Sequence, residues 1–223
     1  MSIKESIVLI NSELPPTTKL VAVSKFHPVE TILEAYDAGQ RLFGESRPQE
    51  LKSKSETLPN DIEWHFIGHL QTNKIKMVVP YATLIHSVDS LHLLREIDNY
   101  CSRNDMTTQV LLQLHIASEE TKQGFSQEEL FGLFDRLSAG EEKFTNVRLR
   151  GVMGMASLTD DEDLIRAEFA NLVAVHKYIH NYSNPYTVNF DQLSFGMSSD
   201  YKIAIEMGST LVRIGTSIFG IRS

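Results

Sequence analysis

The feature that most constrains the fold is an alternation, kept along the whole chain, of short apolar runs with longer amphipathic stretches. The runs are rich in Val, Ile and Leu, which favours buried strands, and the stretches that follow have the apolar spacing of helices. The pattern predicts eight strands, at residues 19–24, 41–43, 63–67, 83–87, 109–116, 147–153, 192–195 and 211–214. It predicts helices at residues 3–14, 28–39, 48–58, 72–79, 91–103 and 199–207, and two more that open at Ser126 and Thr159.

The repeated order of strand and then helix predicts a parallel sheet, because parallel neighbours need a crossover connection. Eight such units in 223 residues suit a compact (β/α)8 barrel, the TIM barrel. We therefore expect an α/β fold with one domain over residues 1–223, a closed barrel with an extra N-terminal helix. An open, doubly wound sheet is the alternative, since a sequence does not show closure.

Local signals mark where several helices begin. Ser126 with Glu129, and Thr159 with Glu162, each have the spacing of a capping box, and His27 before Pro28 is typical of an N-cap. The acidic run at 160–163 then lies at the positive end of a helix dipole. We predict no metal site there.

Composition excludes several classes of protein. The formal net charge is −8 and no basic run occurs, which argues against a nucleic-acid partner. No apolar run approaches the roughly 20 residues of a membrane-spanning helix, and the first 15 residues do not resemble a secretory signal. The single cysteine, Cys101, allows no internal disulfide and is expected to pack in the core. Together these observations predict a cytoplasmic protein without a membrane partner, and a monomer is the default.

In a barrel of this kind the functional site lies at the C-terminal ends of the strands, and the last two loops often hold a phosphate. The loop after the seventh predicted strand contains Gly196, Ser198 and Ser199, which offer hydroxyl and N–H groups at a helix start. Gly215 and Thr216 follow the eighth strand. A plain serine N-cap is the alternative interpretation of the first loop.

Arg213 lies between the apolar Val212 and Ile214 of the eighth strand, so its side chain must point to the opposite face. A charged group there needs an anion, an acceptor or water. A structural pair with a carboxylate on a neighbouring strand is the alternative.

Lys25 ends the first predicted strand and should project into the barrel mouth. A lysine close to other cations in a partly dry site has a lowered pKa and can attack a carbonyl carbon. A lysine, a phosphate cradle and an arginine are together what pyridoxal 5′-phosphate (PLP) requires.

Six motifs, in this order, cover essentially the whole chain and resemble those of the YggS/PROSC family of PLP homeostasis proteins. They are residues 20–25 (LVAVSK), 43–45 (FGE), 64–68 (WHFIG), 70–74 (LQTNK), 196–198 (GMS) and 212–216 (VRIGT). The resemblance implies a barrel similar to the N-terminal domain of alanine racemase.

The resemblance also implies roles for individual residues. It implies that Lys25 carries PLP as a Schiff base, that Ser198, Gly215 and Thr216 hold the phosphate, and that Arg213 faces the pyridine nitrogen. Met197, in the same motif as Ser198, joins the predicted cofactor site. A cation beside that nitrogen disfavours ring protonation, which weakens the ring as an electron sink and suits a carrier.

Ser46 stands where many members of the family carry Asn, so a contact made there by an amide is in doubt. We include Ser46 in the predicted site, together with His65. For His65, a position near the cofactor and a structural hydrogen-bonding role both remain open. Lys122, after the fifth strand, could reach the mouth or be a solvated loop lysine. His27 and His69 are assigned no role.

His176 and His180 lie four residues apart on a predicted helix, a spacing that can bind metal. Barrel helices form the outer ring and no third ligand is apparent, so a packed or solvated pair is expected and no metal site is predicted.

Three functions remain open. The first is a non-catalytic PLP-binding protein that buffers the cofactor or delivers it to apo forms of PLP-dependent enzymes, with no catalytic residue. The second is an amino-acid racemase, and the third is a Schiff-base aldolase for a sugar phosphate. Only seven residues follow Thr216, which leaves no room for the second domain of alanine racemases, and the whole-chain resemblance favours the first.

Overall fold

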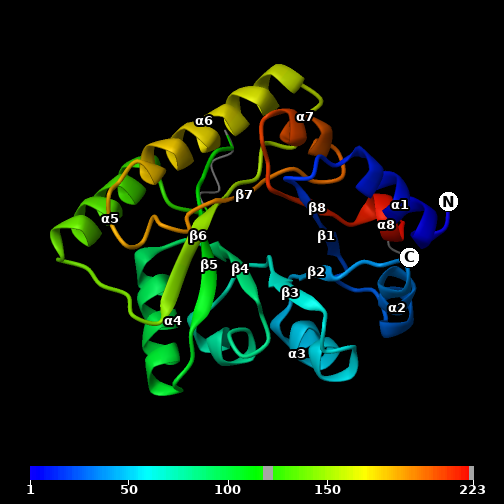
Figure 1. Cartoon of the computed structure of the whole chain (residues 1–223), viewed down its shortest axis with the longest axis horizontal. Coiled ribbons are helices and arrows are strands. Elements are labelled where there is room, and N and C mark those ends of the chain that lie inside the picture. The colour runs from blue at the N-terminus through cyan, green and yellow to red at the C-terminus, as the bar shows by residue number, and fades with distance from the viewer. Residues whose placement is uncertain (118–122, 221–223) are drawn as a thin grey trace.

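The computed structural model describes residues 1–117 and 123–220, which form a closed barrel of eight parallel strands surrounded by helices (Figure 1). The strands are β1 Lys19–Val23, β2 Leu42–Glu45, β3 Glu63–Phe66, β4 Leu84–Val88, β5 Thr108–Gln113, β6 Val147–Met153, β7 Gln192–Ser194 and β8 Leu211–Ile214. Each strand pairs with the next in sequence, and β8 pairs in parallel with β1. The predicted (β/α)8 barrel is confirmed, and closure excludes the open sheet.

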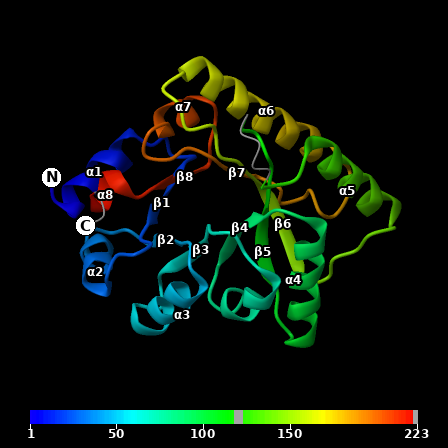
Figure 2. The ribbon, with the colours of Figure 1, turned by 180° about the vertical axis from the view of Figure 1, so that it is seen from behind.

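The helices lie outside the strands in both views (Figures 1 and 2). They are α1 Ile3–Glu13, α2 Val29–Asp37, α3 Pro48–Thr57, the 3₁₀ helix η1 Thr72–Met77, α4 Leu91–Arg103, α5 Gln127–Ala139, α6 Glu162–His180, α7 Tyr201–Glu206 and α8 Thr216–Phe219. The extra N-terminal helix α1 buries Ile7 and Ile10 and packs against α2 and α8. It covers the seam where β8 meets β1.

Two apolar clusters divide the core. The larger one, which includes Leu20, Val212 and Ile214, lies between the strands and the helices. A separate cluster of Val21, Leu84, Leu111, Met153 and Leu211 lies in the barrel interior. Val212 and Ile214 therefore lie outside the strands and Arg213 inside, as strand alternation predicts.

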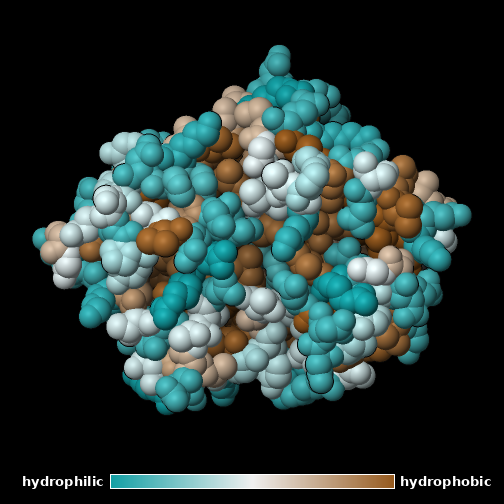
Figure 3. Space-filling model, in the orientation of Figure 1, coloured by the Kyte–Doolittle hydropathy of each residue, from teal (hydrophilic) through white to brown (hydrophobic). Residues whose placement is uncertain are grey.

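The surface of one face is shown in Figure 3, where hydrophilic side chains separate hydrophobic patches.

The structure corrects three local predictions. The second capping box is wrong: α6 begins at Glu162, and the N-cap Asp161 accepts hydrogen bonds from the N–H groups of Asp163 and Leu164. An Asp beside the helix outcompetes the more distant Thr159, which instead accepts from the Asp161 N–H. The N-cap of α2 is Pro28 rather than His27, since the Pro28 carbonyl accepts the first helical hydrogen bond, from the Ile32 N–H. The predicted helix at 72–79 is a 3₁₀ helix that ends at Met77.

Two other local predictions, a capping box and a buried cysteine, are confirmed. The capping box at Ser126 and Glu129 forms as predicted, and Cys101 is fully buried in the core. Among the described residues, no helix has the length and apolarity needed to cross a membrane. Lys122 falls outside the described residues.

We predict that Gly151→Ala destabilises the barrel by about 2–4 kcal/mol. Gly151 pairs with Gln192 of β7 and has φ +148°, and a Cβ at this position would lie 1.8 Å from the Gln192 carbonyl oxygen. The measurement is the free energy of unfolding in urea. Gly132→Ala, where the nearest atom is 3.8 Å away in the middle of α5, is the control and should stabilise by about 0.5–1 kcal/mol. Equal effects of the two changes would contradict the prediction.

Candidate functional site

A cavity of about 590 Å³ lies at the C-terminal ends of the strands, where a barrel of this kind carries its site. Loops from both ends of the chain line it, because β1 and β8 are neighbours. Every predicted cofactor-binding residue except His65 is on its wall: Lys25, Ser46, Met197, Ser198, Arg213, Gly215 and Thr216. The remaining wall residues are Val23, His27, Ile67, Met155, Ser199, Ser217 and Gly220.

One side of this cavity carries polar groups that have no partner within the described part of the chain. The hydroxyls of Ser198, Ser199, Thr216 and Ser217 make no hydrogen bond there, and neither do the backbone N–H groups of these residues and of Gly215. Two short loops after β7 and β8 bring these donors to one place. Converging hydroxyl and N–H donors are suited to an oxyanion such as a phosphate.

The loop after β7 has its shape fixed by Gly196 and Asp200. Gly196 has φ +93°, and a Cβ there would lie 2.4 Å from the Ala204 Cβ, so only glycine fits. The Met197 N–H donates to the Asp200 carboxylate at 2.5 Å. Burial raises the pKa of Asp200, while this hydrogen bond and Arg213 act in the opposite direction. The turn at Gly196 and the hydrogen bond from Met197 to Asp200 thus fix the loop in which Ser198 and Ser199 line the cavity.

Lys25 enters the cavity from the turn that follows β1. The next residue, Phe26, has φ +69°, a left-handed conformation that costs a residue other than glycine about 1–2 kcal/mol. His27 N–H closes the turn on the Ser24 carbonyl at 3.0 Å. The turn, rather than β1 itself, therefore sets the direction of the Lys25 side chain.

Arg213 is a buried cation with 5% of its surface exposed, and it lines the cavity floor. One terminal nitrogen donates to the carbonyl oxygen of Ser194 at 2.9 Å and to its hydroxyl at 2.6 Å, and the other donates to the Gly154 carbonyl at 3.1 Å. Burial lowers the pKa of Arg213 to about 10, so it keeps its charge at neutral pH. No carboxylate of the described residues pairs with it directly, so the alternative of a structural ion pair does not hold.

His65 lies deeper in the barrel and does not line the cavity. Its Nδ1 is 2.9 Å from Nε2 of His86, and Nδ1 of His86 is 2.9 Å from the Ser194 hydroxyl. A continuous chain of hydrogen bonds thus runs from Arg213 through Ser194 and His86 to His65. The structure places His65 in a hydrogen-bonding position behind the arginine.

The donors in this chain can be assigned in one consistent order. Arg213 only donates, so the Ser194 hydroxyl accepts from it and gives its own proton to Nδ1 of His86. His86 then carries its proton on Nε2 and donates to His65. Burial lowers the pKa of His65 to about 3 and that of His86 well below its ordinary value, so both rings are neutral. Neutral rings suit the short contact, because two protonated nitrogens would repel each other.

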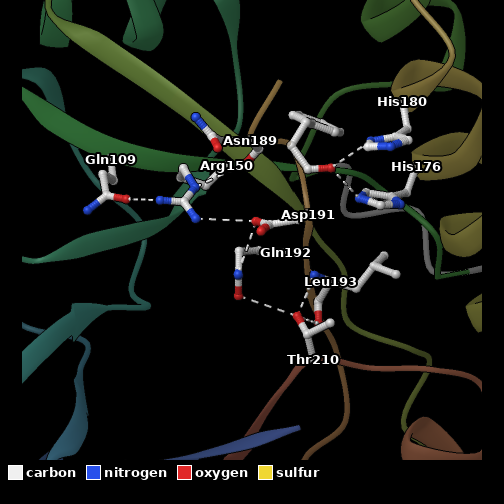
Figure 4. A network of polar contacts seen from close by, with 10 residues as sticks. Gln109, Arg150, His176, His180, Asn189, Asp191, Gln192, Leu193 and Thr210 are labelled. Carbon is white, nitrogen blue, oxygen red and sulfur yellow. Dashed lines mark hydrogen bonds and ion pairs between the residues drawn. The ribbon is translucent and has the colours of Figure 1, made fainter. Parts of the chain in front are cut away.

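The pair His176 and His180 serves the fold. Both rings point to the same place in Figure 4, where their nitrogens lie 3.0 and 3.3 Å from the Phe190 carbonyl oxygen. No group of three metal-ligating side chains occurs among the described residues. The packed pair expected from the sequence is what the structure contains.

A second cavity, also of about 590 Å³, lies at the opposite, N-terminal end of the barrel beside Gln109 and Arg150. Arg150 already donates to Gln109, to the Asn189 carbonyl and to Asp191 (Figure 4). This cavity lacks a lysine with a facing set of hydroxyl groups. The cavity around Lys25 is therefore the candidate site.

Several residues of the site were not identified from the sequence. Ser217 and Met155 line the cavity, and His86 and Ser194 connect to Arg213. The available signal for His86 was a histidine in the short, fully buried strand Leu84–Val88. No sequence signal identified Ser194 as its partner, since the two lie 108 residues apart.

Comparison with known proteins gives consistent results. Residues 2–223 match the family model described as alanine racemase, N-terminal domain. The pyridoxal phosphate homeostasis protein of Aquifex aeolicus is 38% identical over 205 residues, which cover 92% of this chain and 87% of that protein. The protein of the same name from Vibrio alginolyticus is 37% identical, covering 99% and 98%.

Among solved structures, PipY of Synechococcus elongatus with PLP bound superimposes with a TM-score of 0.87 at 34% identity. The match covers 98% of this chain and all of PipY. The same protein without PLP gives a TM-score of 0.90 at 35% identity, with the same coverage. Alanine racemase of Corynebacterium glutamicum gives 0.75 at 12% identity, over 99% of this chain and 61% of the racemase. This last similarity shows the fold alone.

The buried histidines predict how stability depends on pH. Their folded pKa values lie below the ordinary value of 6.5, so as pH falls below 6.5 the unfolded chain takes up protons that the folded chain does not. The free energy of unfolding should therefore decrease as the pH is lowered below 6.5, by about 1.4 kcal/mol per pH unit for each such histidine. Glu45 and Asp200, whose pKa values are raised, act in the opposite direction, so variants must be compared with the wild type.

His65→Gln should reduce the slope of the free energy of unfolding against pH by the contribution of one histidine, about 1.4 kcal/mol per pH unit. The measurement is urea unfolding between pH 6.5 and 5. His92→Gln, on the exposed side of α4, controls for replacing a histidine. A slope unchanged in His65→Gln would show that this ring is not held neutral.

Proposed function

Because the chain belongs to the pyridoxal phosphate homeostasis protein family, we propose that it binds PLP as a Schiff base on Lys25 and buffers or delivers it inside the cell. One observation carries the proposal: Lys25 and the hydroxyl and N–H donors of the loops after β7 and β8 line the same cavity. Each reactive or charged group of PLP has a matching group in the cavity. An amine suits the aldehyde, the donors suit the phosphate, and the guanidinium of Arg213 suits an unprotonated pyridine nitrogen.

Bound PLP supplies an aldehyde that condenses with an amine and an aromatic ring that can withdraw electrons. The Lys25 Nζ lone pair attacks the aldehyde carbon, the C=N bond forms, and the aldehyde oxygen leaves as water. Ser198, Gly215 and Thr216 hold the phosphate, with Met197 shaping the same loop. Ser46 is the residue we assign to the opposite wall.

Arg213 supports a carrier rather than a broad catalyst. Its charge is fixed by three hydrogen bonds and keeps a proton off the pyridine nitrogen, which limits electron withdrawal by the ring. We therefore assign no catalytic residue. Racemisation of an amino acid is the alternative, and chiral analysis of amino acids incubated with the loaded protein separates the two. If the protein is a carrier, we expect no more racemisation of the amino acids than with Lys25→Ala.

The proposed partners are PLP and apo forms of PLP-dependent enzymes. We propose that the protein is a cytoplasmic monomer. Transfer to an apo-enzyme then needs only reversal of the condensation, in which water cleaves the C=N bond and returns the free Lys25 amine.

The proposal predicts that purified protein given PLP develops the visible absorbance band of a Schiff base, and that Lys25→Ala does not. The measurement is an absorbance titration with PLP. Lys52→Ala, on the exposed face of α3, is the matched control and should titrate like the wild type. A Lys25→Ala variant with the wild-type band would overturn the assignment of the lysine.

Thr216→Ala should weaken PLP binding by about tenfold to a hundredfold, because it removes a hydrogen bond to a charged phosphate. Pyridoxal, which lacks the phosphate, is the internal control. Its affinity should stay the same in the variant. An equal loss for both ligands would place the phosphate elsewhere.

A further inference from the structure

We propose that three charged residues behind the cavity, Glu45 of β2 and Glu50 and Lys54 of α3, form a clamp that fixes the backbone on both sides of Lys25. In this proposal Glu50 and Lys54 are positioning residues for the lysine. The idea rests on the proposed function, which makes Lys25 the attachment point. The three residues are called the clamp below.

Lys54 holds the residue before Lys25. Its ammonium group donates to the Ser24 carbonyl at 2.9 Å, to Glu45 at 2.8 Å and to Glu50 at 3.1 Å. These three acceptors use all three of its protons. The side chain is only 8% exposed, which is unusual for a lysine. The buried ammonium group therefore binds the backbone carbonyl next to Lys25 as well as two carboxylates.

Glu50 holds the residue after Lys25. Its Oε2 accepts the Phe26 N–H at 2.8 Å, and the same oxygen accepts from Lys54. Phe26 is the residue with φ +69°, and its ring lies 4.2 Å from the Arg47 guanidinium. A strained conformation persists only where its surroundings enforce it. The hydrogen bond that the Phe26 N–H donates to Glu50 is one contact that holds this conformation.

Glu45 completes the clamp from the strand. It is fully buried and accepts from the Ser24 hydroxyl at 2.7 Å through Oε1. Its other oxygen, Oε2, has no hydrogen-bond partner in the described part of the chain. Burying a carboxylate with an unpartnered oxygen is costly, so the contacts of Glu45 with Ser24 and Lys54 favour a role at the site over one in stability.

The same helix contains a matched pair that lacks these contacts. Lys52 and Glu56 have the spacing of Glu50 and Lys54 with the charges reversed, and they bond at 2.7 Å. Both side chains are exposed, at 41% and 51%, and neither touches the residues beside Lys25. Of the two ion pairs that join residues within α3 in the described structure, the pair of Glu50 and Lys54 contacts the backbone beside Lys25, and the pair of Lys52 and Glu56 does not.

The test compares Glu50→Gln and Lys54→Met with Glu56→Gln and Lys52→Met. The first readout is the rate at which the full-length protein with added PLP develops the Schiff-base band, and the pH midpoint of that band. The two clamp variants should slow the reaction by about tenfold to a hundredfold, because a displaced amine loses its approach to the aldehyde, and should shift the midpoint. The two control variants should keep the wild-type rate and midpoint.

A rescue separates positioning from general destabilisation. Glycine adopts φ +69° without strain, so Phe26→Gly should restore most of the rate to Glu50→Gln. A merely structural role for Glu50 predicts no such rescue. Glu50 is 22% exposed on the helix surface, so Glu50→Gln should fold and keeps the proposal testable if Lys54→Met does not.

A readout without PLP tests the clamp by itself. In the free protein, Glu50→Gln should speed amide hydrogen exchange in the peptide that contains Phe26, and Glu56→Gln should not. Unchanged exchange, or unchanged rate and pH midpoint in the clamp variants, would overturn the clamp. A wild-type protein that forms no band, but in which exchange at Phe26 depends on Glu50, would keep the clamp and reject the proposed function.

Discussion

The parallel pairing of β1 with β8 joins residues 19–22 to residues 211–214 and makes the two ends of the chain neighbours at one seam of the barrel. Lys25 lies just past one side of this seam, and Gly215 and Thr216 lie just past the other. The approach is close, since a Cβ on Gly215 would lie 3.1 Å from the Val23 carbonyl oxygen. The helix α1 covers the seam from outside through Ile7 and Ile10. Lys25 and the residues Gly215 and Thr216 therefore line one cavity only when the barrel is closed.

Closure also creates a dry interior in which polar groups must be satisfied. The apolar cluster that includes Val21, Leu111 and Met153 shares the barrel interior with polar groups, because Val21 pairs with Arg213 and Met153 pairs with Ser194. There Arg213 is held by two carbonyls and the Ser194 hydroxyl, and the chain continues to His86 and His65. A half-satisfied network in such a place would cost more than an apolar core. The network is continuous, and it holds the Arg213 guanidinium in a fixed position at the cavity.

The sequence was informative where the signal was local. Alternation in Val212–Ile214 correctly placed Arg213 inside the barrel, and the loops with Ser198 and Thr216 were found from their position after the last two strands. It was less informative where the decisive contact is long-range. His86 bonds to a residue 108 positions away, and Lys54 reaches back 30 residues to the Ser24 carbonyl. The N-cap of α6 was missed because Asp161, which lies directly before the helix, takes the capping role from Thr159. The left-handed backbone conformation of Phe26 could not be predicted from the sequence, because it depends on tertiary contacts.

The central claim is that Lys25 is the residue that carries PLP. The most direct measurement is reduction of the PLP-loaded protein with borohydride, which converts a C=N bond into a stable amine, followed by peptide mass mapping. We expect the pyridoxyl group on the peptide that contains Lys25 and on no other. A pyridoxyl group on a different lysine, or on none, would contradict the account.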